Sequence, residues 1–182
     1  YQTSDQVSGT ITAADMVGQM LVGGPTTDTT LTAAISDKLI AYNDAKNRSP
    51  ATGANLNIGT PAPGTSGVGT PTFAPGLYTW DENVSMTGNI TLSGGLNDVW
   101  IFHVNGTLTT GGTGIAVILR GSAQVKNIFW VVTGNVSIGT GDTFNGIILG
   151  KTDIWLLTGA TLNGRALSGT QVVLQKATVT QP

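Results

Sequence analysis

The chain has 182 residues, a length that fits one domain with a sizeable hydrophobic core. Only 10% of the residues are charged and the formal net charge is -2. The chain therefore lacks the strongly basic surface that binds nucleic acids or anionic membranes. The 26 glycines and the absence of cysteine favour many short strands joined by tight turns, in a fold that does not depend on disulfides.

A helix is predicted over residues 30–46, where apolar residues recur at i, i+3 and i+4 spacing. Thr30 can cap its start, and Pro50 ends it because the residue before a proline avoids helical geometry. Residues 51–75, rich in Gly, Pro, Thr and Ser, are expected to form a long surface connection. The predicted stripe consists of Leu31, Ala34, Ile35, Lys38, Leu39 and Tyr42.

From residue 76 onward the chain repeats with a period of about 18 to 20 residues. Each repeat has an apolar strand, a turn with Gly, Asn or Asp, a second strand and a second glycine turn. A repeat this short cannot bury its own apolar face, so the repeats are expected to stack as coils of a β-solenoid. The repeats are 77–94, 99–121, 128–146, 147–164 and 165–182.

The first strand of two repeats, 99–104 and 128–132, is almost continuously apolar, which is typical of a strand covered on both faces. The predicted helix is the only available cover, so its stripe is expected to lie over Trp100 and Trp130. The second strands carry small polar residues and are expected to be uncovered, with Trp155 near that open face.

Four motifs carry a resemblance to a known family: 75–80 (PGLYTW), 97–102 (NDVWIF), 123–130 (AQVKNIFW) and 162–167 (LNGRAL). Their order and spacing resemble the microbial ice-binding proteins of the DUF3494 type. The resemblance implies a single domain over 1–182, folded as a right-handed, discontinuous, triangular β-solenoid with a helix alongside one face. It also implies a secreted, non-enzymatic antifreeze protein that inhibits ice recrystallisation.

One departure from the family pattern concerns the start of the chain. Family members normally carry a further segment before the region that matches Tyr1, and this segment completes coils against the C-terminal ones. We expect it to be absent here, which leaves open whether the chain is a trimmed product or closes its solenoid differently. The first residues are not expected to form a signal peptide.

Three second strands carry a Thr-Gly-x-Thr pattern, at 110–113, 140–143 and 158–161, which resembles the family's Thr-Ala/Gly-X-Thr/Asn ice-binding motif. Stacked strands would repeat threonines every 4.7 to 4.9 Å or so across coils and about 6.5 to 7 Å along a strand. The alternative is that threonine is simply a good strand residue and Thr-Gly a common turn. The array is expected to fade at 87–90 and 176–179. The predicted ice-binding residues are Thr110, Thr113, Thr140, Thr143, Thr158 and Thr161.

Other chemistry is sparse. His103 is the only histidine and has no second ligand near it in the sequence, so it is expected to be a strand residue. The carboxylates are too scattered for an acid and base pair, so no catalysis, metal or cofactor is expected, and activity should survive chelation. The charged residues expected to serve turns are Asp98, Asp142, Asp153, Lys126 and Arg165.

The alternative function is a carbohydrate-binding or adhesive solenoid of the cell surface, which should present aromatic platforms and a concave groove. The threonine pattern favours ice and its ordered water as the partner of a monomer. Replacing Thr140 or Thr158 by tyrosine should then abolish activity, whereas Asn145, expected in a turn, should tolerate the same change.

Overall fold

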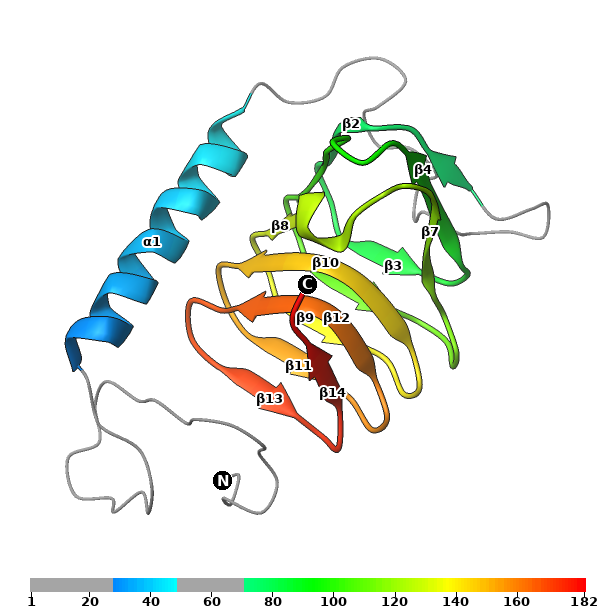
Figure 1. Ribbon diagram of the computed structural model, residues 1–182. Coiled ribbons are helices and arrows are strands. Elements are labelled where there is room, and N and C mark those ends of the chain that lie inside the picture. The colour runs from blue at the N-terminus through cyan, green and yellow to red at the C-terminus, as the bar shows by residue number, and fades with distance from the viewer. Residues whose placement is uncertain (1–27, 49–70) are drawn as a thin grey trace. The chain divides into compact units, whose positions relative to one another are not determined.

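The computed structural model describes residues 28–48 and 71–182 (Figure 1). The chain divides into two compact units, Tyr1–Ala41 and Tyr42–Pro182. Helix α1 (Asp28–Asn47) crosses the boundary, and its last turns belong to the second unit together with all the described strands. No helix among the described residues is long and apolar enough to span a bilayer.

Helix α1 confirms the predicted helix and extends it slightly at both ends. Within the second unit, the predicted stripe is represented by Tyr42, which is 5% exposed. The side chain of Leu31 lies outside the described residues.

The described strands form three parallel sheets. Sheet A contains β14 (Thr178–Thr180), β12 (Thr161–Leu167), β10 (Thr143–Gly150), β8 (Ile128–Val132), β5 (Trp100–Val104) and β2 (Gly76–Trp80), in that order. Sheet B contains β1 (Thr72–Phe73), β4 (Ile90–Gly94) and β7 (Val117–Gly121). Sheet C contains β13 (Val172–Leu174), β11 (Ile154–Leu156), β9 (Val136–Ile138), β6 (Leu108–Thr110) and β3 (Val84–Met86).

These sheets are the sides of a triangular solenoid, as predicted, and the described coils stack in chain order (Figure 1). The side of the solenoid that sheet B forms, which we call the third side, continues beyond β7. A bridge between Ala116 and Thr143 adds the first part of β10 to this side, and the first part of β12 and then β14 follow on the next coils. Strands β10 and β12 then turn into sheet A at Gly146 and Gly164, whose φ angles of 125° and 149° favour glycine.

The core fills with aromatic rings that point into the solenoid. Tyr78, Phe102 and Trp130 stack on successive coils, with 4.2 Å between the ring centroids of Phe102 and Trp130. Two of the buried indole N–H groups donate to backbone oxygens: Trp100 Nε1 to Phe73 O at 3.2 Å and Trp130 Nε1 to Asn145 O at 3.1 Å. These bonds let large amphipathic rings lie in the interior.

The prediction that Trp100 and Trp130 lie under the helix is therefore wrong. Alternate residues of a strand point to opposite faces, and the ones that meet the end of α1 are the neighbours of the tryptophans. An almost fully apolar strand has no polar residue to mark which alternate set faces inward, so the sequence could not decide this. The residues that form this second cluster are Tyr42, Ala45, Ile101, Val131 and Leu149.

Candidate functional site

Two of the three Thr-Gly-x-Thr segments coincide in space. Strands β10 and β12 pair with Thr143 opposite Thr161, which sets the segments 140–143 and 158–161 on adjacent coils. Both turn the corner into the third side at a glycine, with φ angles of 72° at Gly141 and 74° at Gly159. The first threonine of each segment is exposed at the corner, and the last is half-buried on the side itself.

The third segment, 110–113, does not coincide with the other two. Thr109 pairs with Ser137, so Thr110 lies level with Ile138 and faces the core. Thr110 is 8% exposed, and its Oγ1 accepts a hydrogen bond from Gly139 N at 2.6 Å. The structure therefore places Thr110 inside the solenoid, away from the other predicted site residues.

Thr113 takes the corner position instead. The bridge from Ala116 to Thr143 sets Thr113 level with Thr140, and Thr113 is exposed. The residue of this coil that lies level with Thr143 is thus Ala116. The sequence pattern aligned Thr110 with Thr140, one threonine too early, because this coil has a longer glycine-rich return and so short a pattern fits either alignment.

The third side carries three rows of outward residues, which we call the threonine face. Residues in a row come from successive coils and lie level with one another in the parallel register. The corner row is Thr113, Thr140 and Thr158; the middle row is Ala116, Thr143, Thr161 and Thr178; the amide row is Asn145, Asn163 and Thr180.

The amide row is held by a chain of side-chain hydrogen bonds. Asn145 Nδ2 donates to Val117 O at 2.6 Å, and Asn163 Nδ2 donates to Asn145 Oδ1 at 2.9 Å. Asn145 is 9% exposed and lies within β10. The prediction that it lies in a control turn is therefore wrong, because its amide spans two coils of the candidate surface.

Four residues of this face were missed by the sequence reasoning: Asn145, Asn163, Thr178 and Thr180. The signal was present as alternation, since 143–145, 161–163 and 178–180 read Thr-x-Asn, Thr-x-Asn and Thr-x-Thr. Alternate residues of a strand share a face, which puts both polar residues of each triplet outside. The expected fading at 176–179 is not seen at Thr178, which pairs with Thr161.

The threonine face is uncharged and regular. Parallel pairing spaces its rows by about 4.7 to 4.9 Å between strands and by about 6.5 to 7 Å along each strand. Threonine is stiff at χ1, so its methyl and hydroxyl groups hold fixed directions on a fixed backbone. None of the residues in the three rows is ionisable.

The carboxylates that the sequence placed in turns do accept hydrogen bonds there. Asp98 Oδ2 accepts from Gly95 N at 2.7 Å, and Asp142 Oδ1 accepts from Ile115 N at 2.8 Å. Asp153 accepts from side chains instead, and the bonds from the Thr170 hydroxyl and then the Gln171 amide hold the pKa of Asp153 below its ordinary value.

The remaining residues singled out by sequence do not form a reactive site. His103 lies in β5, with its Nε2 at 2.5 Å from Ala45 O, and burial lowers its pKa. Lys126 and Arg165 are exposed. In the described parts of the chain no three His, Cys, Asp or Glu side chains gather into a metal-binding group.

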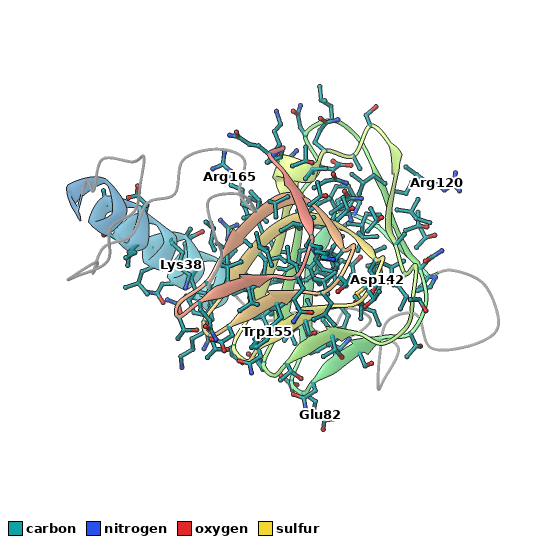
Figure 2. The ribbon with its side chains drawn as sticks, turned by 90° about the horizontal axis from the view of Figure 1, so that it is seen from below. Lys38, Glu82, Arg120, Asp142, Trp155 and Arg165 are labelled. Atoms are coloured by element: carbon teal, nitrogen blue, oxygen red, sulfur yellow. The ribbon has the colours of Figure 1, made fainter. Side chains whose placement is uncertain are left out.

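Sheet C presents a different outer surface. Its outward row is Ser85, Thr109, Ser137, Trp155 and Val173 on successive coils. Trp155 is half-buried, whereas the other three tryptophans are buried in the core. Figure 2 shows Trp155 and Arg120 on different sides of the solenoid.

A triangular stack of parallel coils defines the class of β-solenoid proteins. The chain belongs to the ice-binding-like family, whose model matches residues 1–180. This family is non-enzymatic, so the chain is not an enzyme.

Individual relatives are similar over almost the whole chain. An ice-binding protein of Colwellia sp is 40% identical over 180 residues, which cover 98% of this chain and 67% of that protein. An ice-binding protein of Flavobacterium frigoris (strain PS1) is 40% identical over 179 residues, covering 98% of this chain and 61% of that protein. The chain thus spans roughly two thirds of the length of these relatives.

A solved structure is also similar. The antifreeze ice-binding protein from an Arctic yeast superposes with a TM-score of 0.78 at 36% identity, covering 87% of this chain and 66% of that one.

Proposed function

We propose that this protein binds ice crystals through the threonine face and thereby produces thermal hysteresis and inhibits ice recrystallisation. The observation that carries the proposal is the middle row, in which Thr143, Thr161 and Thr178 lie level on adjacent coils. The similarity of the chain to ice-binding proteins of two bacteria supports the same function.

The physical basis is a surface that needs little further ordering. Each threonine methyl restricts the water beside it while the hydroxyl anchors a water molecule, and the parallel backbone fixes their spacing. The amide chain from Val117 through Asn145 to Asn163 immobilises the neighbouring row. Because the groups are already fixed, ice that forms against them does not impose much loss of side-chain entropy.

The location follows from the ligand. Extracellular water is where ice crystals first meet a cell, so we propose that the protein acts outside the cell as a monomer.

A bulky change in the middle row tests the proposal. Thr161→Tyr should place a phenol above the row, hold ice away from Thr143 and Thr178, and remove most of the thermal hysteresis and recrystallisation inhibition. The matched control is Ser137→Tyr, because Ser137 is also a half-buried outward residue but lies on sheet C. Both variants should keep the melting temperature of the parent within a few degrees, since an outward side chain displaces no core atom.

The result that would refute the site is a folded Thr161→Tyr variant with full ice activity. Loss of activity in Ser137→Tyr with retention in Thr161→Tyr would move the ice contact to sheet C. Capture of a fluorescently labelled parent by a growing ice hemisphere tests ice binding itself, whichever side is used.

A further inference from the structure

Three oxygen atoms from the coils of β6 and β9 lie close together, around the side of Gly139 where a side chain would begin. A Cβ atom built on Gly139 would lie 2.6 Å from Asp142 Oδ2, 3.0 Å from Thr110 O and 3.1 Å from Gly112 O. Two of these atoms are backbone carbonyls and the third belongs to a carboxylate. A carbonyl oxygen has no proton to donate, so it can only accept a hydrogen bond or bind a cation.

The carboxylate at this point is buried and half-satisfied. Asp142 is 1% exposed; its Oδ1 accepts from Ile115 N at 2.8 Å, but its Oδ2 receives no hydrogen bond from the described residues. A buried carboxyl oxygen without a partner is unfavourable. Figure 2 shows Asp142 between the sides that carry Trp155 and Arg120.

The neighbouring coils show that an acid is not needed for packing here. The pairing of Thr143 with Thr161, and its bridge to Ala116, set Asp142 level with Ala160 on one side and with Ile115 on the other. Both of those residues are buried and apolar. The acid is therefore specific to this coil, where the glycine-rich return of 111–114 lies beside it.

The hydrogen bonding of Thr110 leaves its carbonyl available. In the register that pairs Thr109 with Ser137, the next ladder bond would run from Gly139 N to Thr110 O. Gly139 N donates instead to Thr110 Oγ1, at 2.6 Å. The threonine hydroxyl thus takes the N–H that would otherwise occupy the carbonyl.

We propose that Asp142 Oδ2, Thr110 O and Gly112 O form a binding site for a small hard cation, Ca²⁺ or Na⁺. A single water molecule has two hydrogens and can satisfy only two of the three acceptors, whereas a cation attracts all three. Carboxylate and carbonyl oxygens are the ligands that Ca²⁺ uses, with waters completing its shell. No metal was expected from the sequence because two of the three ligands are backbone carbonyls. Every residue has a carbonyl, so the sequence does not show which ones bind a metal.

The site would strengthen the fold and is separate from the ice contact. Its three oxygens come from two coils, so a cation there links the return at 110–112 to the corner at 139–142. The side chain of Asp142 points inward, between the outward residues Thr140 and Thr143. Ice activity measured near freezing should therefore survive chelation, while resistance to heating should not.

The experiment compares thermal unfolding of the whole chain after EDTA treatment and dialysis. Samples receive CaCl₂, NaCl or choline chloride at matched ionic strength, and equilibrium dialysis with labelled Ca²⁺ counts the bound ions. The parent should melt about 5 to 10 °C higher with Ca²⁺ at about 100 times its dissociation constant. A similar rise with NaCl but not with choline would identify Na⁺ as the occupant and also supports the site.

The main variant is Asp142→Asn. Its amide keeps the acceptor for Ile115 N and offers N–H donors to the two carbonyls, so it should fold without the cation and lose the response to it. Gly139→Ala, whose Cβ would lie 2.6 to 3.1 Å from the three oxygens and crowd an ion between them, should lose the response as well. Asp153→Asn, on an exposed acid of the same solenoid, should keep it.

A parent whose melting temperature is the same in Ca²⁺, Na⁺ and choline, and which binds no Ca²⁺, overturns the proposal. An Asp142→Asn variant that responds as the parent does also overturns it. If Asp142→Asn does not fold, Gly139→Ala decides by the same comparison.

Discussion

The placement of Thr110 can be tested by making one substitution at two threonines that the sequence pattern treats as equivalent. Valine has nearly the shape of threonine but lacks the hydroxyl. At Thr110 the change removes the acceptor of the Gly139 N–H, whereas at Thr143 the side chain is outward and half-buried.

Loss of a hydrogen bond costs about 0.5 to 1.5 kcal/mol when the buried donor can move to a second acceptor, here the Thr110 carbonyl. For a chain of this size 1 kcal/mol lowers the melting temperature by about 2 to 4 °C, so Thr110→Val should melt about 1 to 6 °C lower than the parent. Thr143→Val should stay within about 0.5 kcal/mol of the parent, as surface changes do. Urea unfolding followed by tryptophan fluorescence gives both values.

The effects on ice activity should be the reverse of the effects on stability, with the larger loss of activity in Thr143→Val. Thr110→Val should keep the thermal hysteresis of the parent, because residue 110 faces the core. If Thr110→Val is as stable as the parent but loses ice activity, Thr110 lies on the ice-contacting surface and the register described for β6 and β9 is wrong.

Three further outcomes are expected. Tyr42→Ala should cost about 3 to 5 kcal/mol in chemical denaturation, because Tyr42 is 5% exposed and packs against Ile101 and Val131. Phe102→Ala should cost about 3 to 5 kcal/mol and broaden the near-ultraviolet dichroism, since its ring stacks on Trp130. Because burial lowers the pKa of His103, the unfolded chain binds more protons; stability should be complete above about pH 6.5 and fall below it, and His103→Gln should flatten that slope in urea melts from pH 8 to 5.

The architecture could be predicted because the sequence repeats at a regular period. A repeated strand and turn pattern forces stacking, and the three parallel sheets follow from it. The direction of each side chain was harder. The strand 100–104 is apolar at nearly every position, so nothing local distinguishes Trp100, which faces the core, from Ile101, which meets the end of α1.

The candidate site was predictable where coils have equal length. Segments 140–143 and 158–161 align in sequence and in space because no residue is inserted between them. The coil that contains Thr110 has a longer return, and there sequence spacing and spatial register diverge. Asn145 was misjudged for another reason: Asn followed by Gly is typical of a turn, but the bend at Gly146 lies within a continuous strand.

The uninterrupted pairing of β10 with β12, from Thr143 opposite Thr161 to Leu149 opposite Leu167, has a consequence for how such a surface can change in size. Equivalent positions on these coils present the same backbone edges, so a copy of the segment 143–160 inserted after residue 160 would meet a matching neighbour above and below. Each inserted copy would lengthen every row by one residue, or about 4.8 Å, and would replace the contacts of one pair of coils by two equivalent sets. The contact area with a crystal would then increase in fixed steps by gene-segment duplication, which point substitutions on a surface of constant length cannot achieve.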